Sequence, residues 1–173
     1  MNEVIKNIKE RRSIRKYKED MLPKEIIEKI VEAGTYAPSG MGKQSSIIVA
    51  VTNKEVRDKL SKLNAKIMGT NIDPFYGAPV VLIVLAKKDI PTYIYDGSLV
   101  MENLMLSANS LGIGSCWIHR AKEEFETEEG KEILKSLGIN PEEYEGIGNC
   151  ILGYKAEEGT LKPRKENYVY YIE

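Results

Sequence analysis

The chain has 173 residues, a length typical of a single domain with its own hydrophobic core. Its 25 Lys and Arg residues balance 26 Asp and Glu residues, so the overall charge does not favour binding to nucleic acid or to an anionic membrane. The longest apolar run, 78–86, is too short to cross a bilayer, and residues 1–10 do not resemble a signal peptide, so we expect a cytoplasmic protein.

The first expected element is an amphipathic helix over 2–10, followed by the basic stretch 11–17, which reads RRSIRKY. Arg side chains offer planar, bidentate donors to phosphate oxygens, and Ser13 adds a short donor. The stretch therefore indicates a site for a compact dianion such as phosphate. A solvated basic face at the end of a helix is the alternative.

A second helix is expected from Pro23 to Gly34, and the loop 37–46 then leads into a strand over 47–51. This loop, APSGMGKQSS, is built of small, polar and flexible residues, and it is longer than most connections between a helix and a strand. Two interpretations of this loop stay open: a backbone that closely approaches a ligand, and an ordinary connection between a helix and a strand.

The middle of the chain predicts a helix capped by Asn53, an irregular segment over 65–77 and a central strand over 80–85. The irregular segment is either a binding segment or flexible padding. A further helix over 97–111, with Asp96 as its cap, is apolar around most of its circumference. Such a helix is either central in the fold or shared with another subunit.

The last third predicts a strand over 115–119, a charged loop, a helix over 128–137 and a strand over 147–154. Gly112 and Gly114 do not form a dinucleotide fingerprint, because here a helix precedes the strand. A second cationic cluster lies at 162–165.

The C-terminal residues 168–172, YVYYI, have a strong strand propensity and need a sheet edge to pair with. The edge could belong to the same subunit or to a second copy of the chain. A second copy would also explain the apolar helix over 97–111.

The chain offers few metal ligands, because it has only two cysteines, Cys116 and Cys150, and one histidine, His119. We therefore expect no metal site. Both cysteines are expected to be buried thiols. No Ser-His-Asp set or Cys-His pair is recognisable, and we name no catalytic side chain.

Four motifs, in order along nearly the whole chain, resemble those of the FMN-dependent nitroreductase family. They are Arg11-Arg12-Ser13-Ile14-Arg15, Ala37-Pro38-Ser39-Gly40-Met41-Gly42-Lys43-Gln44, Gly112-Ile113-Gly114-Ser115-Cys116-Trp117-Ile118, and Leu152-Gly153-Tyr154 followed by Pro163-Arg164.

The resemblance implies one FMN-binding domain over 1–173 with an α+β, three-layer nitroreductase-like fold. A mixed central β-sheet is flanked by helices in an intertwined homodimer, with FMN sites at the subunit interface. The FMN phosphate and ribityl chain would lie against the N-terminal motif, and a second pair of cations would reach the phosphate from the other end of the chain. These residues are Arg11, Arg12, Ser13 and Arg15, together with Arg164 and Lys165.

The resemblance also assigns residues to the flavin ring. One loop would come from the partner subunit, and backbone groups at the end of a strand would lie along the ring in their own subunit. The loop residues are Pro38, Ser39, Gly40 and Gln44, and the strand residues are Trp117, Ile118 and His119. The chain has Gly42 and Ser45 where the resemblance gives asparagine and proline in many members, so a side-chain amide contact near the flavin stays open, and a backbone contact or water could replace it.

The function implied by the resemblance is that of an FMN-dependent NAD(P)H oxidoreductase. NADH or NADPH would pass hydride to flavin N5, and a nitroaromatic, quinone or similar conjugated acceptor would then take its place in a ping-pong cycle. His119 is a conceivable proton donor, although a lone histidine at a strand end is more often structural.

Three other interpretations stay open. The first is a specialised FMN enzyme of the same fold that performs dehydrogenation or dehalogenation, and the second is a flavin-binding store or sensor without turnover. The third is a nucleic-acid arm over 9–18, which the neutral total charge and the flanking Glu10, Glu19 and Asp20 disfavour.

Overall fold

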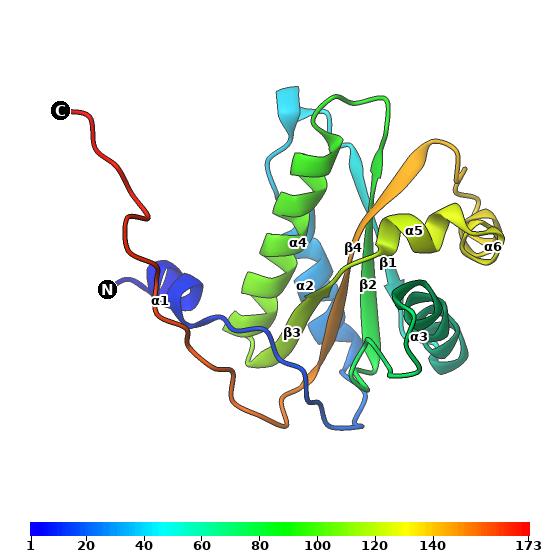
Figure 1. The fold of residues 1–173 in the computed structure, drawn as a ribbon, viewed down its shortest axis with the longest axis horizontal. Coiled ribbons are helices and arrows are strands. Elements are labelled where there is room, and N and C mark those ends of the chain that lie inside the picture. The colour runs from blue at the N-terminus through cyan, green and yellow to red at the C-terminus, as the bar shows by residue number, and fades with distance from the viewer.

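The computed structural model describes residues 1–173 and has three layers, with a four-stranded sheet between two layers of helices (Figure 1). The strands are β1 (Ser46–Val51), β2 (Val80–Lys87), β3 (Ile113–Ile118) and β4 (Tyr144–Tyr154). The helices are α1 (Glu3–Glu10), α2 (Lys24–Thr35), α3 (Lys54–Met68), α4 (Tyr93–Ser110), α5 (Ala121–Glu126) and α6 (Glu128–Ser136), with one short 3₁₀ turn at Gly40–Gly42. The α+β, three-layer prediction is confirmed.

The strand order is β1-β2-β4-β3, and every pair of neighbouring strands is antiparallel. Within one chain, the expected mixed sheet is therefore an antiparallel one. Its single parallel contact is an isolated bridge between Ser13 and Ser115, at the free edge of β3. The prediction of a central strand over 80–85 is confirmed, because β2 has a neighbour on each side and its residues 80–86 are buried.

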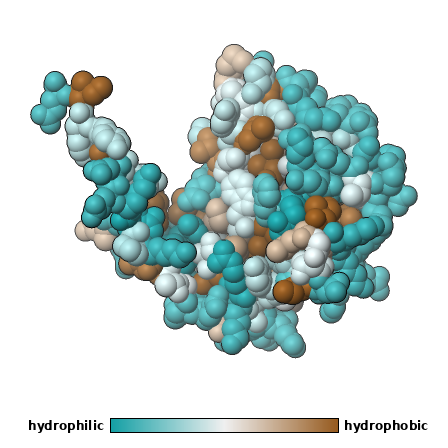
Figure 2. All heavy atoms as spheres, in the orientation of Figure 1, coloured by the Kyte–Doolittle hydropathy of each residue, from teal (hydrophilic) through white to brown (hydrophobic).

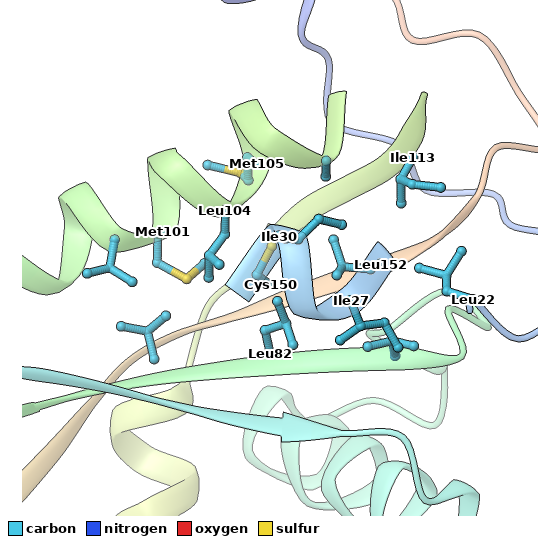
Figure 3. Close-up of a cluster of buried hydrophobic side chains, with 14 residues drawn as sticks. Leu22, Ile27, Ile30, Leu82, Met101, Leu104, Met105, Ile113, Cys150 and Leu152 are labelled. Atoms are coloured by element: carbon cyan, nitrogen blue, oxygen red, sulfur yellow. The ribbon is translucent and has the colours of Figure 1, made fainter. Parts of the chain in front are cut away.

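Two hydrophobic cores form because alternate residues of a strand point to opposite faces of the sheet. Leu82 and Leu152 face α2 and α4, whose apolar side chains complete the first core around Leu104 (Figure 3). The other face packs against α3, α5 and α6 and includes Ile83. Cys116 and Cys150 are both buried free thiols, as predicted.

Several boundaries differ from those predicted. The third helix runs on to Met68 and ends at Gly69, whose φ of 73° lies in the left-handed region that glycine adopts without strain, so only the later part of 65–77 is irregular. The segment expected to be a charged loop after β3 contains α5, because Phe125 and its neighbours face the second core.

The prediction that Asp96 caps α4 is wrong, because this helix begins a turn earlier and Thr92 is its N-cap residue. The Asp96 carboxylate instead receives hydrogen bonds from the backbone N–H of Gly40 at 2.9 Å and from the Ser45 hydroxyl at 2.7 Å. It thereby fixes the loop that precedes β1.

The C-terminal residues 168–172 are not paired with any strand of their own chain. Figures 1 and 2 show them at the end of an arm that extends away from the body of the molecule. In one chain, therefore, these residues have no sheet edge to pair with. None of the helices combines the length and the apolar composition that a membrane span requires.

Candidate cofactor site

The basic stretch 11–15 is docked on the free edge of β3. Ile14, only 1% exposed, anchors it in the body, and its backbone N–H donates to the Ser115 carbonyl at 2.9 Å. Ser13 forms the adjacent bridge to Ser115. Because β3 is an edge strand, its outward-facing backbone groups are free to bind this segment.

The chain after β4 returns to the same place. The Lys18 N–H donates to the Tyr154 carbonyl at 3.0 Å, and the Ala156 N–H donates to the Lys16 carbonyl at 2.9 Å. Further on, Gly159 crosses directly over Arg12: a Cβ at Gly159 would come within 2.2 Å of the Arg12 Cβ. These contacts lay the C-terminal segment alongside the N-terminal one.

The two segments together enclose a cavity of about 990 Å³. Its lining includes six cationic side chains and two carboxylates. The cations are Lys9, Arg11, Arg12, Arg15, Lys162 and Arg164, and the acids are Glu157 and Glu158. Ser13 lines the same cavity. The structure thus brings together both cationic clusters, although about 150 residues separate Arg12 from Arg164 in the sequence.

Several of these polar groups are already engaged within the chain. One Arg12 nitrogen donates to the carbonyls of Lys9 and Arg11, and the Glu157 carboxylate accepts the backbone N–H of Arg15 at 2.7 Å. The Nη1 atom of Arg11, in contrast, is buried without any hydrogen-bond partner. The one carboxylate close to the Arg11 side chain belongs to Glu102, whose Oε1 lies 3.8 Å from Nε of Arg11. An unpaired guanidinium nitrogen is a donor in need of an anionic acceptor.

Lys165 does not line this cavity; its Nζ lies 5.3 Å from the centre of the Tyr168 ring. Tyr17 is structural rather than part of the site, because its hydroxyl donates to the Ile14 carbonyl at 2.6 Å and its ring lies against Gly114 and Gly153. Burial raises its pKa strongly, and the hydroxyl stays neutral.

A second cavity, of about 330 Å³, adjoins the first at Arg15 and lies along the end of β3. Trp117, Ile118 and His119 line it, as does the segment from Met68 to Tyr76. Since the Ser115 carbonyl points outward to Ile14, the backbone groups of Trp117, two residues further on, also face the free edge. The predicted strand residues therefore lie next to the basic stretch.

The loop residues Pro38, Ser39 and Gln44 line a different cavity, of about 390 Å³, between β1, α2 and α4. In one chain they do not join the cationic cavity. Burial of Asp96 works to raise its pKa, but the hydrogen bonds from Gly40, Ser45 and Thr92 outweigh it and hold this pKa below its usual value. The carboxylate is ionised and keeps the loop in place.

A buried polar cluster supports the junction between β3 and α5. Asn64 on α3 is fully buried; its Nδ2 donates to the His119 carbonyl at 2.9 Å, and its Oδ1 accepts from Arg120 Nε at 3.0 Å. Arg120 has a φ of 78°, in the left-handed region that costs non-glycine residues energy. The two Asn64 bonds hold this conformation.

Below this junction, the Glu124 carboxyl on α5 accepts a hydrogen bond from Asn149 Nδ2 on β4 at 2.6 Å. Both side chains are fully buried, and Glu124 Oε1 and Asn149 Oδ1 have no partner. Burial raises the pKa of Glu124 to about 7. A proton on Glu124 supplies one donor to a pair that otherwise has two unpartnered oxygens.

Sequence reasoning missed Asn64, Arg120, Glu124 and Asn149. Each reads as an ordinary polar residue in its own segment, and only the fold brings them together. The one available signal was for the segment 65–77, which was recognised as a possible binding segment and does border the second cavity.

An edge strand that gathers arginines from both ends of the chain offers several charge-assisted donors to the phosphate of a phosphorylated cofactor. This chain belongs to the nitroreductase family: the model described as "Nitroreductase family" matches residues 8–154.

Relatives and solved structures agree with this assignment. A protein of Archaeoglobus fulgidus with the provisional name NADH dehydrogenase/NAD(P)H nitroreductase is 34% identical, over 91% of this chain and 88% of that protein. An FMN reductase [NAD(P)H] of Bacillus subtilis is 25% identical, over 95% of this chain and 70% of the relative. The structure of a nitroreductase with bound FMN from Bacteroides fragilis matches with a TM-score of 0.89 and 31% identity, over 100% of both chains.

Proposed function

We propose that this chain is an FMN-dependent NAD(P)H oxidoreductase that holds the cofactor phosphate in the cavity between Arg11 and Arg164. The observation that carries the proposal is the convergence of the two cationic clusters on one cavity. The nitroreductases of Bacteroides fragilis and Desulfitobacterium hafniense, which align with the whole of this chain at TM-scores of 0.89, were solved with FMN bound.

The residues present fit a phosphorylated cofactor. The cavity lining contains six cationic side chains and only two acids, and the Glu157 carboxylate already accepts the backbone N–H of Arg15. The cavity therefore has an excess of positive charge for a dianion. The partnerless Nη1 of Arg11 supplies a donor that a phosphate oxygen would satisfy. Arg12, Ser13 and Arg15 complete this end of the site in the proposal, whereas Lys165 would have to turn away from Tyr168 to take part.

The adjoining cavity at the end of β3 would receive the flavin ring, because Arg15 borders both cavities. FMN, when bound, supplies the hydride-transfer chemistry. The chain's own contribution is to orient the ring through backbone groups of Trp117, Ile118 and His119. Asn64 keeps the last of these in position through its hydrogen bond to the His119 carbonyl.

A homodimer is supported by the apolar surface that one chain leaves uncovered. The α1 helix has no buried residue, and Val4 and Ile8 on it are 68% and 52% exposed. The arm ends in Tyr168–Ile172, which are all exposed. A second copy could cover both surfaces and bring Pro38, Ser39, Gly40 and Gln44 to the flavin ring, which these residues do not reach in a single chain.

The electron donor in this proposal is NADH or NADPH, and the acceptor is a nitroaromatic, quinone or similar conjugated molecule that uses the same cavity in turn. The cytoplasm is the compartment that contains both pyridine nucleotides, and the free thiols of Cys116 and Cys150 agree with it.

The test is an absorption spectrum of the purified protein with and without added FMN, followed by anaerobic addition of NADH or NADPH. We expect one FMN per chain and bleaching of the flavin band, which an acceptor then restores. A protein that takes up no FMN would refute the proposal. Bound flavin that neither nucleotide bleaches would refute the oxidoreductase activity and favour a flavin store or sensor.

The dimer has a separate test in deletion of residues 167–173, measured by sedimentation. We expect the shortened chain to dissociate at concentrations where the full chain is dimeric, because the deletion removes the segment Tyr168–Ile172 that would pair with a sheet edge of the partner. A deletion that leaves the dimer equally stable would exclude this role of the arm.

A further inference from the structure

We propose that Arg120 binds an anionic group on the aromatic acceptor, so that the preferred acceptors carry a carboxylate or sulfonate in addition to their reducible group. This inference rests on the proposed function and specifies its substrate class. It comes from the cavity at the end of β3, which Arg120 and the segment 68–76 both line.

Apolar side chains form the outer wall of this cavity. Met68, Ile72 and Tyr76 line it and are 55%, 72% and 40% exposed, although each is a large apolar residue that would be buried in a core. Exposed apolar groups that surround a cavity favour a flat aromatic ligand, because its burial removes their surface from water together with its own.

The charge of the cavity is positive. Arg15 and Arg120 line it, and neither guanidinium takes part in a salt bridge. The only acid in the lining is Asp73, which is paired with Arg57 at 2.6 Å. That carboxylate also accepts hydrogen bonds from the Ser61 hydroxyl and from the backbone N–H groups of residues 75 and 77, so its oxygens have no capacity left for a ligand.

Arg120 is fixed in place with part of its guanidinium free. Its Nε donates to Asn64, while its Nη2 contacts only the sulfur of Met68, at 3.3 Å, and Nη1 has no partner. Sulfur is a weak acceptor. The two terminal nitrogens can therefore exchange a weak contact for a bidentate bond to a carboxylate, and little conformational freedom is lost because the side chain is already held.

Two ligands could supply the anion: the acceptor, or the phosphate groups of NADPH. The structure favours the acceptor because the segment 68–76 lines this cavity with the exposed apolar side chains of Met68, Ile72 and Tyr76, which suit an aromatic ring beside the flavin better than a phosphorylated ribose. Kinetics with matched substrates distinguish the two sources.

The experiment uses the FMN-loaded protein and compares Arg120→Gln with Arg120→Lys. Both variants lose the Nε bond to Asn64, but only the first loses the charge, so the difference between them isolates electrostatics from folding. Lys62→Gln, on the exposed face of α3, is the control for loss of one positive charge. Melting temperatures and flavin spectra verify that each variant is folded and loaded.

With NADH as donor, we expect Arg120→Gln to lower kcat/KM for 4-nitrobenzoate about tenfold or more, through KM, and for uncharged 4-nitrobenzyl alcohol by less than about twofold. Arg120→Lys should recover most of the loss, and the ratio of NADPH to NADH activity should not change. Equal losses for both acceptors in Arg120→Gln would overturn the proposal, as would a loss confined to NADPH.

A binding measurement independent of turnover uses Trp117, the only tryptophan, which borders the cavity. Benzoate, which is not reduced, should change its fluorescence with a Kd about tenfold weaker in Arg120→Gln than in the wild type. An unchanged Kd would refute the Arg120 contact even in a fully active enzyme. Failure of the wild type to bind FMN or to be bleached by NADH would instead refute the proposed function.

Discussion

The two ends of the proposed flavin site are built in different ways. The ring end, at the junction of β3 and α5, rests on Asn64, Glu124 and Asn149, all 0% exposed and contributed by three different elements. The phosphate end is formed by the basic stretch and the C-terminal arm, and α1 beside it buries no residue. One end is fixed by the core and the other lies on its surface.

This difference implies that the ring end is preorganised, whereas the phosphate end becomes fully ordered when an anion or a second subunit joins it. Such an end, in one chain without its anion, is expected to show an unpaired donor like Nη1 of Arg11 and internal bonds like those from Arg12 to the carbonyls of Lys9 and Arg11. Substitutions at the ring end should therefore change the stability of the protein, and substitutions at the phosphate end should change cofactor affinity.

The largest effect is expected for the pH dependence that Glu124 contributes. The folded-state pKa is raised to about 7 from 4.5, so the stabilisation is fully present below pH 4.5 and is lost as the pH rises through about 7. The difference in pKa corresponds to about 3 kcal/mol of unfolding free energy. Burial is the main cause of the raised pKa; the side chains of Asn149, Asn64 and Arg120 lower it, and Glu123 raises it, by smaller amounts.

Glu124→Gln provides the measurement, because the amide mimics the protonated acid at every pH. Urea denaturation between pH 4.5 and 8.5 should show the wild type losing stability relative to this variant as the pH rises. Glu126→Gln, on the exposed side of the same helix, should show no such trend. Parallel curves for wild type and Glu124→Gln would mean that Glu124 is ionised throughout.

The next effect concerns Asn64→Ala, which removes the support of the left-handed Arg120. The His119 carbonyl and Arg120 Nε both lose their partner, and we expect a loss of about 2–3 kcal/mol of unfolding free energy in the FMN-free protein. Asn71→Ala, at an exposed position in the following loop, is the control and should change little. A stable Asn64→Ala variant would show that the junction is held by packing alone.

The phosphate end should respond in the opposite way. Arg11→Ala and Arg164→Ala each remove charge-assisted hydrogen bonds to the phosphate, and we expect FMN binding to weaken by about 1.5–2 kcal/mol in titrations of the FMN-free protein. Their urea midpoints without FMN should match the wild type. Lys24→Ala, at an exposed position in the first turn of α2 and outside the cavity lining, is the charge control. Wild-type FMN affinity in either arginine variant would remove that residue from the site.

The contrast between the two ends also explains what the sequence could predict. The phosphate end was recognisable because arginines cluster locally in the motif 11–15 and again near Arg164, and a local cluster is visible without knowing the fold. The central strand and the cap at Asn53, which accepts the Val56 N–H as expected, were recognisable for the same reason.

The buried polar support of the ring end was not recognisable, because its residues come from α3, α5 and β4. Asn149 sits in an otherwise apolar strand, and α5 was expected to be a charged loop because its buried Phe125 is surrounded in sequence by glutamates. A long-range hydrogen bond such as that between Asn149 and Glu124 leaves no periodic pattern. For the same reason the role of Asp96 was misjudged: its partners Gly40 and Ser45 lie more than fifty residues away.

The smallest effect is expected in the loop before β1. Asp96 fixes this loop, as the buried polar side chains fix the ring end. In one chain the loop lies apart from both ends of the proposed flavin site. Gly42 has a φ of 65°, and a Cβ there would meet nothing within 4 Å. Asparagine tolerates this left-handed conformation better than other non-glycine residues, and it is the residue that the resemblance described above gives at this position. Gly42→Asn should therefore change stability by no more than about 0.5 kcal/mol. In the proposed dimer, the added amide should tighten FMN by about 0.5 kcal/mol, the low end for one hydrogen bond. Gly138→Asn, at another left-handed glycine with open space, is the matched control and should leave FMN affinity unchanged. Equal FMN affinity in both variants would mean that the loop does not reach the flavin of the partner.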